Sequence, residues 1–229
     1  MIMRRILTVL QFNLAIFDLD GTLLDTSSGI VDSIRDTMIY FNRKIPSDDE
    51  LLKFIGPPIQ DSFKCYYGLT KEETEEMATV FRQIYKDVHL LKAKPYDGIY
   101  DLLLALKRNS MHIAVATNKR IDYTKILLQA YDFLSLFDVI CGSDFDQKKR
   151  KKDIIYDAIK SIGSDDLRAV MVGDTFGDYD GARLCGLPFI GITYGFGFKK
   201  KEEILNFNGV KYVASNVNEL ENYLCEDFK

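Results

Sequence analysis

Cysteine is scarce in this sequence, and the few cysteines are spaced too widely to build a cross-linked or zinc-bound domain. Four of the 229 residues are cysteine, and no two of them form a Cys-x-x-Cys pair. Disulfide frameworks and structural zinc sites rely on recurring or closely spaced cysteines, so neither is expected here. The pattern is typical of a protein from a reducing compartment.

Long apolar runs and an excess of positive charge are also missing. No apolar stretch approaches the roughly 20 residues that cross a bilayer, and the first 20 residues lack the small-residue cleavage site of a signal peptide. The 30 Lys and Arg residues are outnumbered by 34 Asp and Glu residues, which gives a net charge of -4. We therefore expect a cytoplasmic protein, a monomer by default, with no membrane and no nucleic-acid partner.

The composition that is present fits a folded chain with a sizeable core. Apolar residues make up 47% of the sequence and charged residues 28%, and a chain of this length corresponds to one or two domains. Five short runs are apolar nearly throughout, as expected of parallel strands that are covered on both faces. These runs are LAIFDLD (14–20), HIAVATN (112–118), FDVICG (137–142), AVMVGD (169–174) and FIGITYG (189–195), with KYVAS (211–215) as a candidate edge strand.

Helical patterns alternate with the later strands. Three such stretches cover residues 98–109, 122–134 and 153–163, and this alternation indicates βαβ units in an open parallel sheet. The segment from 27 to 94 differs, because it contains helical periodicity alone, including a capping box formed by Thr70 and Glu73.

The fold class predicted from this order is α/β with an insertion. We expect a three-layer Rossmann-like core with an open parallel sheet, formed by residues 1–26 and 95–229. A small all-helical cap domain, residues 27–94, is inserted after the first strand, and Pro95 and Gly98 mark the return of the chain to the core.

Functional side chains stand at or just beyond the ends of four of the predicted strands. Ligands of open parallel sheets bind at the carboxyl ends of the strands, so these segments are expected to converge there. Strand residues alternate in direction, which would direct Asp18 and Asp20 to one side and Leu19 into the core. The candidate residues are Asp18 and Asp20, Thr117 and Asn118, Lys151 and Lys152, and Asp174 and Asp178.

Several carboxylates in one crevice repel one another unless a cation binds between them. A set made of oxygen ligands, with room for waters and a substrate phosphate, suits Mg²⁺ better than zinc. The sequence therefore predicts a magnesium site, and a nucleophile beside a proton donor in FDLDGTLLDT (17–26).

The order of these motifs resembles the haloacid dehalogenase superfamily of phosphatases. The chain has DxDGTLLDT, then a strand ending in Thr, then a lysine, then GDxxxD, and the resemblance covers essentially the whole sequence. The position of the insertion resembles the subgroup that carries a helical cap between the first two motifs. FIGPPIQDSF (54–63) and GITYGFG (191–197) are similar to phosphoglycolate phosphatase-like and 5′-nucleotidase-like members.

This resemblance implies a role for each acidic residue. Asp18 would attack phosphorus and form an aspartyl phosphate, and Asp20 would protonate the leaving alcohol and later deprotonate a water. Mg²⁺ would be held by the carboxylates of Asp18 and Asp174 and the backbone carbonyl of Asp20. Asp178 would bind the ion or orient a water on it.

The resemblance also implies a phosphate-binding set and a specificity loop. Thr117 and the amide of Asn118 would bind the phosphoryl oxygens, and a lysine would neutralise their charge. The family often has Lys-Pro at this point, whereas QKKRKKDII (147–155) contains no proline. Alignment on Lys-x-Asp selects Lys151, with Lys152 second and Lys149 third. Substrate specificity is assigned to the loop that contains Ile55, Gly56 and Pro57.

The predicted function is a Mg²⁺-dependent phosphatase that acts on a small phosphorylated metabolite and is phosphoglycolate phosphatase-like. Alternatives are a 5′-nucleotidase, a sugar-phosphate mutase of the β-phosphoglucomutase type, and a phospho-accepting module without enzymatic turnover. The helical insertion and the second acid, Asp20, argue against the module, since a stable phosphorylated switch gains nothing from a hydrolytic acid/base. A dehalogenase is disfavoured because a departing halide needs no proton donor.

Overall fold

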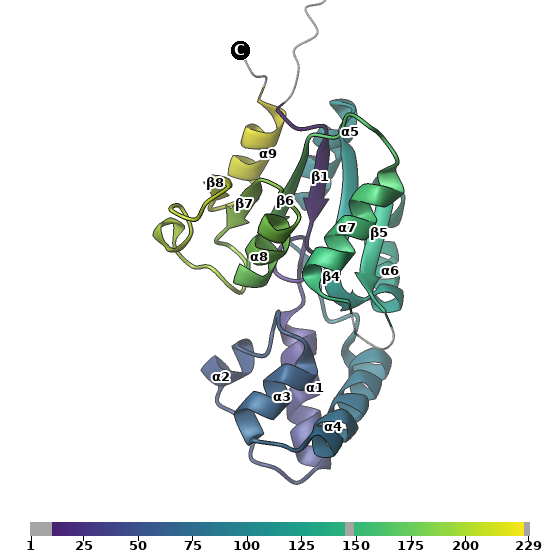
Figure 1. Cartoon of the computed structure of the whole chain (residues 1–229). Helices are drawn as coiled ribbons and strands as arrows, with labels where there is room; N and C mark the ends of the chain where they lie inside the picture. Colours follow the sequence, from purple (N-terminus) through teal and green to yellow (C-terminus); the bar gives the residue numbers. More distant parts are fainter. Residues whose placement is uncertain (1–10, 145–148, 227–229) are drawn as a thin grey trace, which may run out of the picture.

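The computed structural model describes residues 11–144 and 149–226 of the chain. A parallel six-stranded sheet with the strand order β5-β4-β1-β6-β7-β8 forms its centre (Figure 1). All five predicted strands and the edge strand are confirmed, each within a few residues of its expected bounds. The strands are β1 (Leu14–Phe17), β4 (His112–Arg120), β5 (Val139–Ser143), β6 (Ala169–Gly173), β7 (Phe189–Ile192) and β8 (Val210–Ala214).

Helices cover both faces of this sheet, which confirms the three-layer core. Alternate residues of β1 take part in different hydrophobic clusters: Ala15 and Phe17 in one, Leu14 and Ile16 in the other. The first cluster includes residues of α5, α6 and α9, and the second includes residues of α7 and α8. The bounds are α5 (Ile99–Arg108), α6 (Ile121–Ala130), α7 (Lys151–Ile162), α8 (Phe176–Leu184) and α9 (Val217–Cys225).

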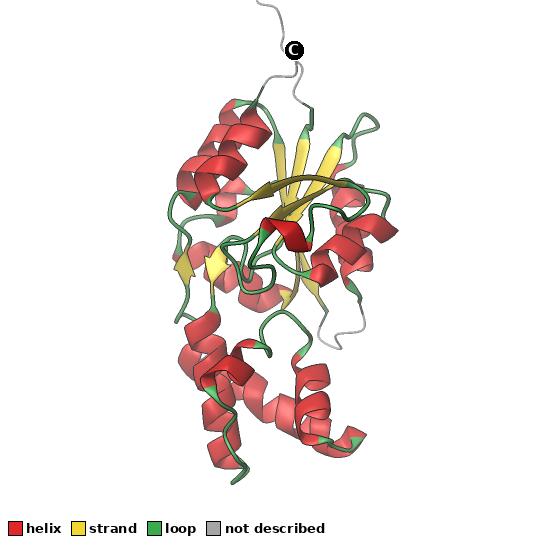
Figure 2. Ribbon diagram, turned by 90° about the vertical axis from the view of Figure 1, so that its left-hand side faces the viewer, coloured by secondary structure: helices red, strands yellow, loops and turns green. Residues whose placement is uncertain are grey.

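The segment that follows β1 is helical and lies beyond the carboxyl end of that strand (Figures 1 and 2). The capping box predicted at Thr70 is present: its hydroxyl accepts a hydrogen bond from the Glu73 amide at 3.2 Å, and the Glu73 carboxylate accepts one from the Thr70 amide at 2.9 Å. The helices are α1 (Ser27–Tyr40), α2 (Asp48–Leu52), α3 (Ile59–Tyr67), α4 (Lys71–Ile84) and the π-helical turn η1 (Tyr85–His89).

A two-stranded antiparallel ribbon joins this helical segment to the sheet, and the sequence did not predict it. β2 (Leu24–Asp25) pairs with β3 (Lys94–Pro95), and the two short strands lie between the sheet and the helices in Figure 2. Strands of two residues are too short to show a period of two, which explains why no pattern revealed them. The short 3-10 turns are η2 (Leu134–Leu136) and η3 (Lys201–Glu203).

Within the described residues, the longest apolar helical stretch falls short of what a bilayer crossing requires.

A tight turn directly after β1 carries the chain away from the sheet. Gly21 has φ +81°, and its amide donates a hydrogen bond to the Leu24 carbonyl at 2.8 Å. A Cβ at this position would lie 2.4 Å from Oδ2 of Asp174 and 2.8 Å from Cδ2 of Phe196. Glycine is therefore required at position 21 for two reasons: the backbone has positive φ, and a side chain would clash with Asp174 and Phe196.

We expect Gly21→Ala to lower the free energy of unfolding by about 2–5 kcal/mol, because positive φ and a steric clash add up. Gly68→Ala is the matched control, since Gly68 has φ +63° with nothing within 4 Å of the added Cβ, and it should cost only about 1–2 kcal/mol. Urea unfolding of both variants measures the difference. Equal losses would contradict the clash with Asp174.

Candidate active site

The predicted residues are brought together at the carboxyl edge of the sheet. Asp18 directly follows β1, and its amide donates to the Val172 carbonyl of β6 at 3.0 Å, which extends the strand pairing by one residue. Asp174 follows β6, the neighbour of β1 on one side. Thr117 and Asn118 lie towards the end of β4, the neighbour on the other side. Adjacent parallel strands thus place these residues side by side.

One lysine of the basic run faces this edge. Lys151 is the first residue of α7, and its Nζ lies 2.6 Å from Oδ1 of Asp18 and 2.7 Å from Oδ1 of Asp178. Its side chain is only 6% exposed. Lys152 is exposed, and Lys149 pairs with Asp157 at the surface. Lys148 lies outside the described residues.

Three buried carboxylates form a compact cluster, and two of them contact this lysine. Asp18, Asp174 and Asp178 each offer an oxygen within 4.8 Å of the other two. Three negative charges face one positive charge, so the cluster with Lys151 carries a net charge of -2 when all groups are ionised. An all-oxygen donor set with this charge suits a hard divalent cation such as Mg²⁺.

The electrostatics of the cluster reflect this excess of negative charge. Burial raises the pKa of Asp18 well above its usual range, with Lys151 opposing and the charges of Asp178 and Asp174 adding to the rise. Burial also raises the pKa of Asp174, and the charge of Asp178 adds to it. Burial alone would lower the pKa of Lys151, but Asp178 and Asp18 outweigh it and raise the pKa. A bound cation would relieve the repulsion among the carboxylates.

Backbone amides and hydroxyls fix two of the carboxylates in place. Oδ2 of Asp174 accepts hydrogen bonds from the amides of Phe196 and Gly197, at 2.7 and 3.0 Å. Oδ2 of Asp178 accepts from the amide and the hydroxyl of Thr175, at 3.0 and 2.7 Å, in a capping box that starts α8. Because Oδ2 of Asp178 is bound by Thr175, its other oxygen, Oδ1, forms the ion pair with Lys151.

Asp20 stands apart from the three-carboxylate cluster and has partners of its own. Its Oδ1 accepts from the Thr26 hydroxyl at 2.7 Å, and its Oδ2 lies 3.2 Å from Nζ of Lys119. Lys119 also donates to the Tyr85 hydroxyl at 2.8 Å, so Asp20 is connected to the helical segment through a buried side chain.

Lys119 and Tyr85 did not emerge from the sequence. The two are 34 residues apart, and no local pattern indicates their contact. A weaker signal was present, because Lys119 directly follows the strand-end pair Thr117 and Asn118. Burial alone would lower the pKa of Lys119, but Asp20 and Tyr85 raise it above its usual value, so the lysine remains charged.

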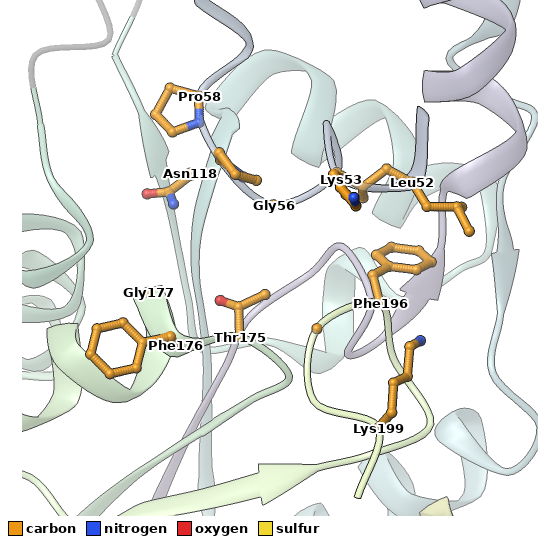
Figure 3. A pocket seen from close by; sticks show the side chains of 13 residues that line it. Leu52, Lys53, Gly56, Pro58, Asn118, Thr175, Phe176, Gly177, Phe196 and Lys199 are labelled. Atoms are coloured by element: carbon orange, nitrogen blue, oxygen red, sulfur yellow. The ribbon is translucent and has the colours of Figure 1, made fainter. Parts of the chain in front are cut away.

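The remaining candidates are Thr117, Asn118 and the predicted specificity loop. The Thr117 hydroxyl is buried and accepts a hydrogen bond from the Lys119 amide at 3.2 Å. Asn118 lines a cavity of about 520 Å³ together with Ile55, Gly56 and Pro57 of the segment between α2 and α3 (Figure 3). The predicted specificity loop therefore lines the same cavity as Asn118 at the predicted phosphate-binding strand end.

Comparison with known proteins gives the same picture over most of the chain. The sequence model of the haloacid dehalogenase-like hydrolase family matches residues 15–192. Phosphoglycolate phosphatase from Agrobacterium fabrum is 32% identical over 189 residues, which cover 80% of this chain and 81% of that protein. Tyrosine-protein kinase PtkA from Mycobacterium tuberculosis is 32% identical over 185 residues, which cover 80% of this chain but 63% of that protein.

Solved structures agree with the sequence comparison. The crystal structure of a predicted phosphatase from Clostridium acetobutylicum superimposes with a TM-score of 0.84 and 37% identity, covering 92% of this chain and 97% of that one. The matched family segment begins at β1 and ends with β7, so it contains every side chain of the acidic cluster. This chain belongs to the haloacid dehalogenase-like hydrolase family.

Proposed function

We propose that this protein is a Mg²⁺-dependent phosphatase that hydrolyses a small phosphate monoester through an aspartyl phosphate on Asp18. The observation that carries the proposal is the position of Lys151, which lies within 2.7 Å of both Asp18 and Asp178 at the edge where Asp174 also stands. The proposed nucleophile Asp18, the charged ammonium group of Lys151 and two further carboxylates thereby lie close together at the carboxyl edge of the sheet. The chemistry is phosphoglycolate phosphatase-like.

The carboxylates of Asp18, Asp174 and Asp178 and the backbone carbonyl of Asp20 are the groups that would hold Mg²⁺. When bound, the ion would supply positive charge to the transferring phosphoryl group and to its oxygens. The remaining steps are assigned to the side chains of this chain.

Asp18 is the proposed nucleophile. Its carboxylate oxygen forms a bond to phosphorus while the bond between phosphorus and the alcohol oxygen breaks, which leaves the phosphoryl group on Asp18. Lys151, Thr117 and the amide of Asn118 bind the phosphoryl oxygens. Because Lys151 is buried and its pKa is raised, it is charged before the substrate arrives, and such preorganised charge favours the transition state.

Asp20 is the proposed acid and base. It gives a proton to the departing alcohol oxygen and then takes one from the water that attacks the aspartyl phosphate, which returns Asp18 and releases inorganic phosphate. Lys119 and Thr26 hold the two oxygens of Asp20, at 3.2 and 2.7 Å. We assign Lys119 as a positioning residue, because it acts on the reaction through Asp20.

The helical segment is the proposed cap. Residues 27–94 would cover the site, and residues 1–26 and 95–229 would form the catalytic core. The ribbon of β2 and β3 and the contact between Tyr85 and Lys119 connect the two parts. A cap that covers the carboxyl edge would exclude bulk water during phosphoryl transfer.

Other functions of the same fold give different products. A sugar-phosphate mutase returns the phosphoryl group to a sugar and depends on a bisphosphate, whereas the proposed phosphatase releases phosphate steadily without one. A phospho-accepting module would take up a single phosphoryl group and stop. Turnover of 4-nitrophenyl phosphate with continuous release of phosphate supports the proposal, and a single stoichiometric phosphorylation would refute it.

Substitutions at the nucleophile and the lysine test the assignment of roles. We expect Asp18→Asn to abolish turnover of 4-nitrophenyl phosphate, and Lys151→Ala to lower kcat by about 100- to 1,000-fold, as when a preorganised donor is removed. Lys152→Ala should keep nearly the wild-type rate, because Lys152 is exposed. A larger loss in Lys152→Ala than in Lys151→Ala would show that the wrong lysine is assigned.

Lys119→Met should lower kcat more for a substrate with a poor leaving group than for one with a good leaving group. An alkyl phosphate needs protonation by Asp20, so its kcat should fall by about 100-fold, whereas 4-nitrophenyl phosphate has a good leaving group and should lose much less. Steady-state kinetics with both substrates measure the contrast, and Lys119→Arg, which keeps the charge, should restore part of the loss. An equal loss with both substrates would assign Lys119 a purely structural role.

Mg²⁺ should raise the thermal midpoint of the wild-type protein, because the ion binds the folded cluster and not the unfolded chain. Asp174→Asn should abolish this shift, which differential scanning fluorimetry with and without Mg²⁺ would measure. Asp157→Asn is the matched control, since Asp157 pairs with Lys149 at the surface. A shift retained in Asp174→Asn would place the ion elsewhere.

A further inference from the structure

The basic run at the start of α7 contains more positive charge than the proposed mechanism uses. Lys151 faces the buried carboxylates, whereas Lys149, Arg150 and Lys152 are exposed. Lys149 pairs with Asp157 at 2.7 Å. Arg150 and Lys152 are left over, because neither side chain forms an ion pair with a residue that the structure describes.

These two cations line a cavity of about 690 Å³ whose walls come from both parts of the chain. The helices α3 and α4 form the wall on the side of the helical segment, and α7, α8 and the end of β4 form the wall on the side of the core. The charged residues of the lining are Asp61 and Glu75 on the helical segment, and Lys149, Arg150, Lys151, Lys152 and Asp180 on the core. Asp180 is already paired with Arg183 of its own helix, at 2.7 Å.

The charges that remain have opposite signs on the two walls. Asp61 and Glu75 are negative, Arg150 and Lys152 are positive, and all four side chains are exposed. None of the four forms an ion pair within residues 11–144 and 149–226. Surfaces of opposite charge that face one another attract, and the two positive charges here match the two negative ones. The cavity therefore fits closure of its own walls better than it fits an ionic ligand.

The two acidic residues differ in their surroundings. Burial lowers the pKa of Arg82, which shares α4 with Glu75, and the charge of Glu75 opposes this lowering. Glu75 thus already interacts with a cation of the helical segment. Asp61, in the first turn of α3, is the residue from which we expect the larger contribution across the cavity.

A buried acceptor next to Asp61 also has no partner. Oε1 of Gln60 is shielded from water, yet it accepts no hydrogen bond from any residue that the structure describes. Gln60 lines the same cavity as Asn118, Arg150 and Lys152, whose side chains can all donate. Buried polar atoms are nearly always hydrogen-bonded, so an arrangement in which the two walls meet would satisfy this oxygen.

We propose that Asp61 and Glu75 form ion pairs with Arg150 and Lys152 and thereby hold the helical segment closed against the core, as an electrostatic latch. This inference rests on the proposed role of residues 27–94 as a cap. Exposed ion pairs are individually weak, and two of them would favour the closed arrangement by about two- to thirtyfold. Such a latch favours closure and still allows the cap to open for product release. Loss of one cation, as in Lys152→Ala, leaves the other pair and changes the rate little.

The first test captures the closed arrangement without relying on activity. A water-soluble carbodiimide joins a carboxylate to an amine that touches it, with loss of water and without a spacer. In the monomeric fraction of wild-type protein treated with Mg²⁺, mass spectrometry should identify a link from Lys152 to Asp61 or Glu75. The link between Lys149 and Asp157, which lie 2.7 Å apart, is the positive control. The control link without any link from Lys152 to the helical segment overturns the latch.

The second test exchanges the charges. Asp61→Lys and Arg150→Glu each replace an attraction by a repulsion, so each should lower kcat/KM for 4-nitrophenyl phosphate by about three- to tenfold. The double variant restores an ion pair of reversed polarity and should return kcat/KM to within about twofold of the wild type. Losses that simply multiply in the double variant would show that the two residues do not interact, and would overturn the latch.

Glu76→Lys is the matched control for this rescue. Glu76 is exposed on α4 and does not line the cavity, so its replacement adds the same charge to the helical segment at another place. Combined with Arg150→Glu it should restore nothing, and a rescue equal to that by Asp61→Lys would refute the latch. If the wild type hydrolyses no phosphate ester, the phosphatase function fails, while the cross-link still decides whether the latch forms.

Discussion

The close approach of three buried carboxylates, two of them paired with one buried lysine, is the constraint on which the architecture of this edge depends. Asp18, Asp174 and Asp178 lie within reach of a single ion, and Lys151 neutralises only part of their charge. Charges taken out of water are costly unless they are paired or bind a cation. The remaining negative charge explains why the carboxyl edge of this sheet suits a divalent cation.

The sheet and the glycine turn make this approach possible. β1 is the central strand with β4 and β6 as its neighbours, so residues that follow β1 and β6 meet without any long side chain. Gly21 leaves room for the Asp174 carboxylate, which is fixed by the amides of Phe196 and Gly197. The turn, the strand ends and the loop after β7 thus support one another.

The sequence predicted the elements with strong periodicity and the side chains next to strand ends. Apolar runs identified every strand of the large sheet. The resemblance to the family, aligned on Lys-x-Asp, selected Lys151 ahead of Lys152 and Lys149, and Lys151 is the first residue of α7. The ribbon of β2 and β3 was missed because strands of two residues carry no period. The contact of Lys119 with Tyr85 was missed because it depends on how the helical segment packs, which no local pattern contains. The cavity beside Asn118 likewise arises only when three separate loops meet.

The proposed division of the site follows from the same geometry. In the proposed function, phosphoryl chemistry would belong to the buried charges at the edge of the sheet, and substrate choice to the segment between α2 and α3. The most direct measurement is an anomalous difference map from crystals grown with Mn²⁺ in place of Mg²⁺. The account predicts a peak among the carboxylates of Asp18, Asp174 and Asp178. A map with no peak there, or with a peak at another acidic group, would contradict it.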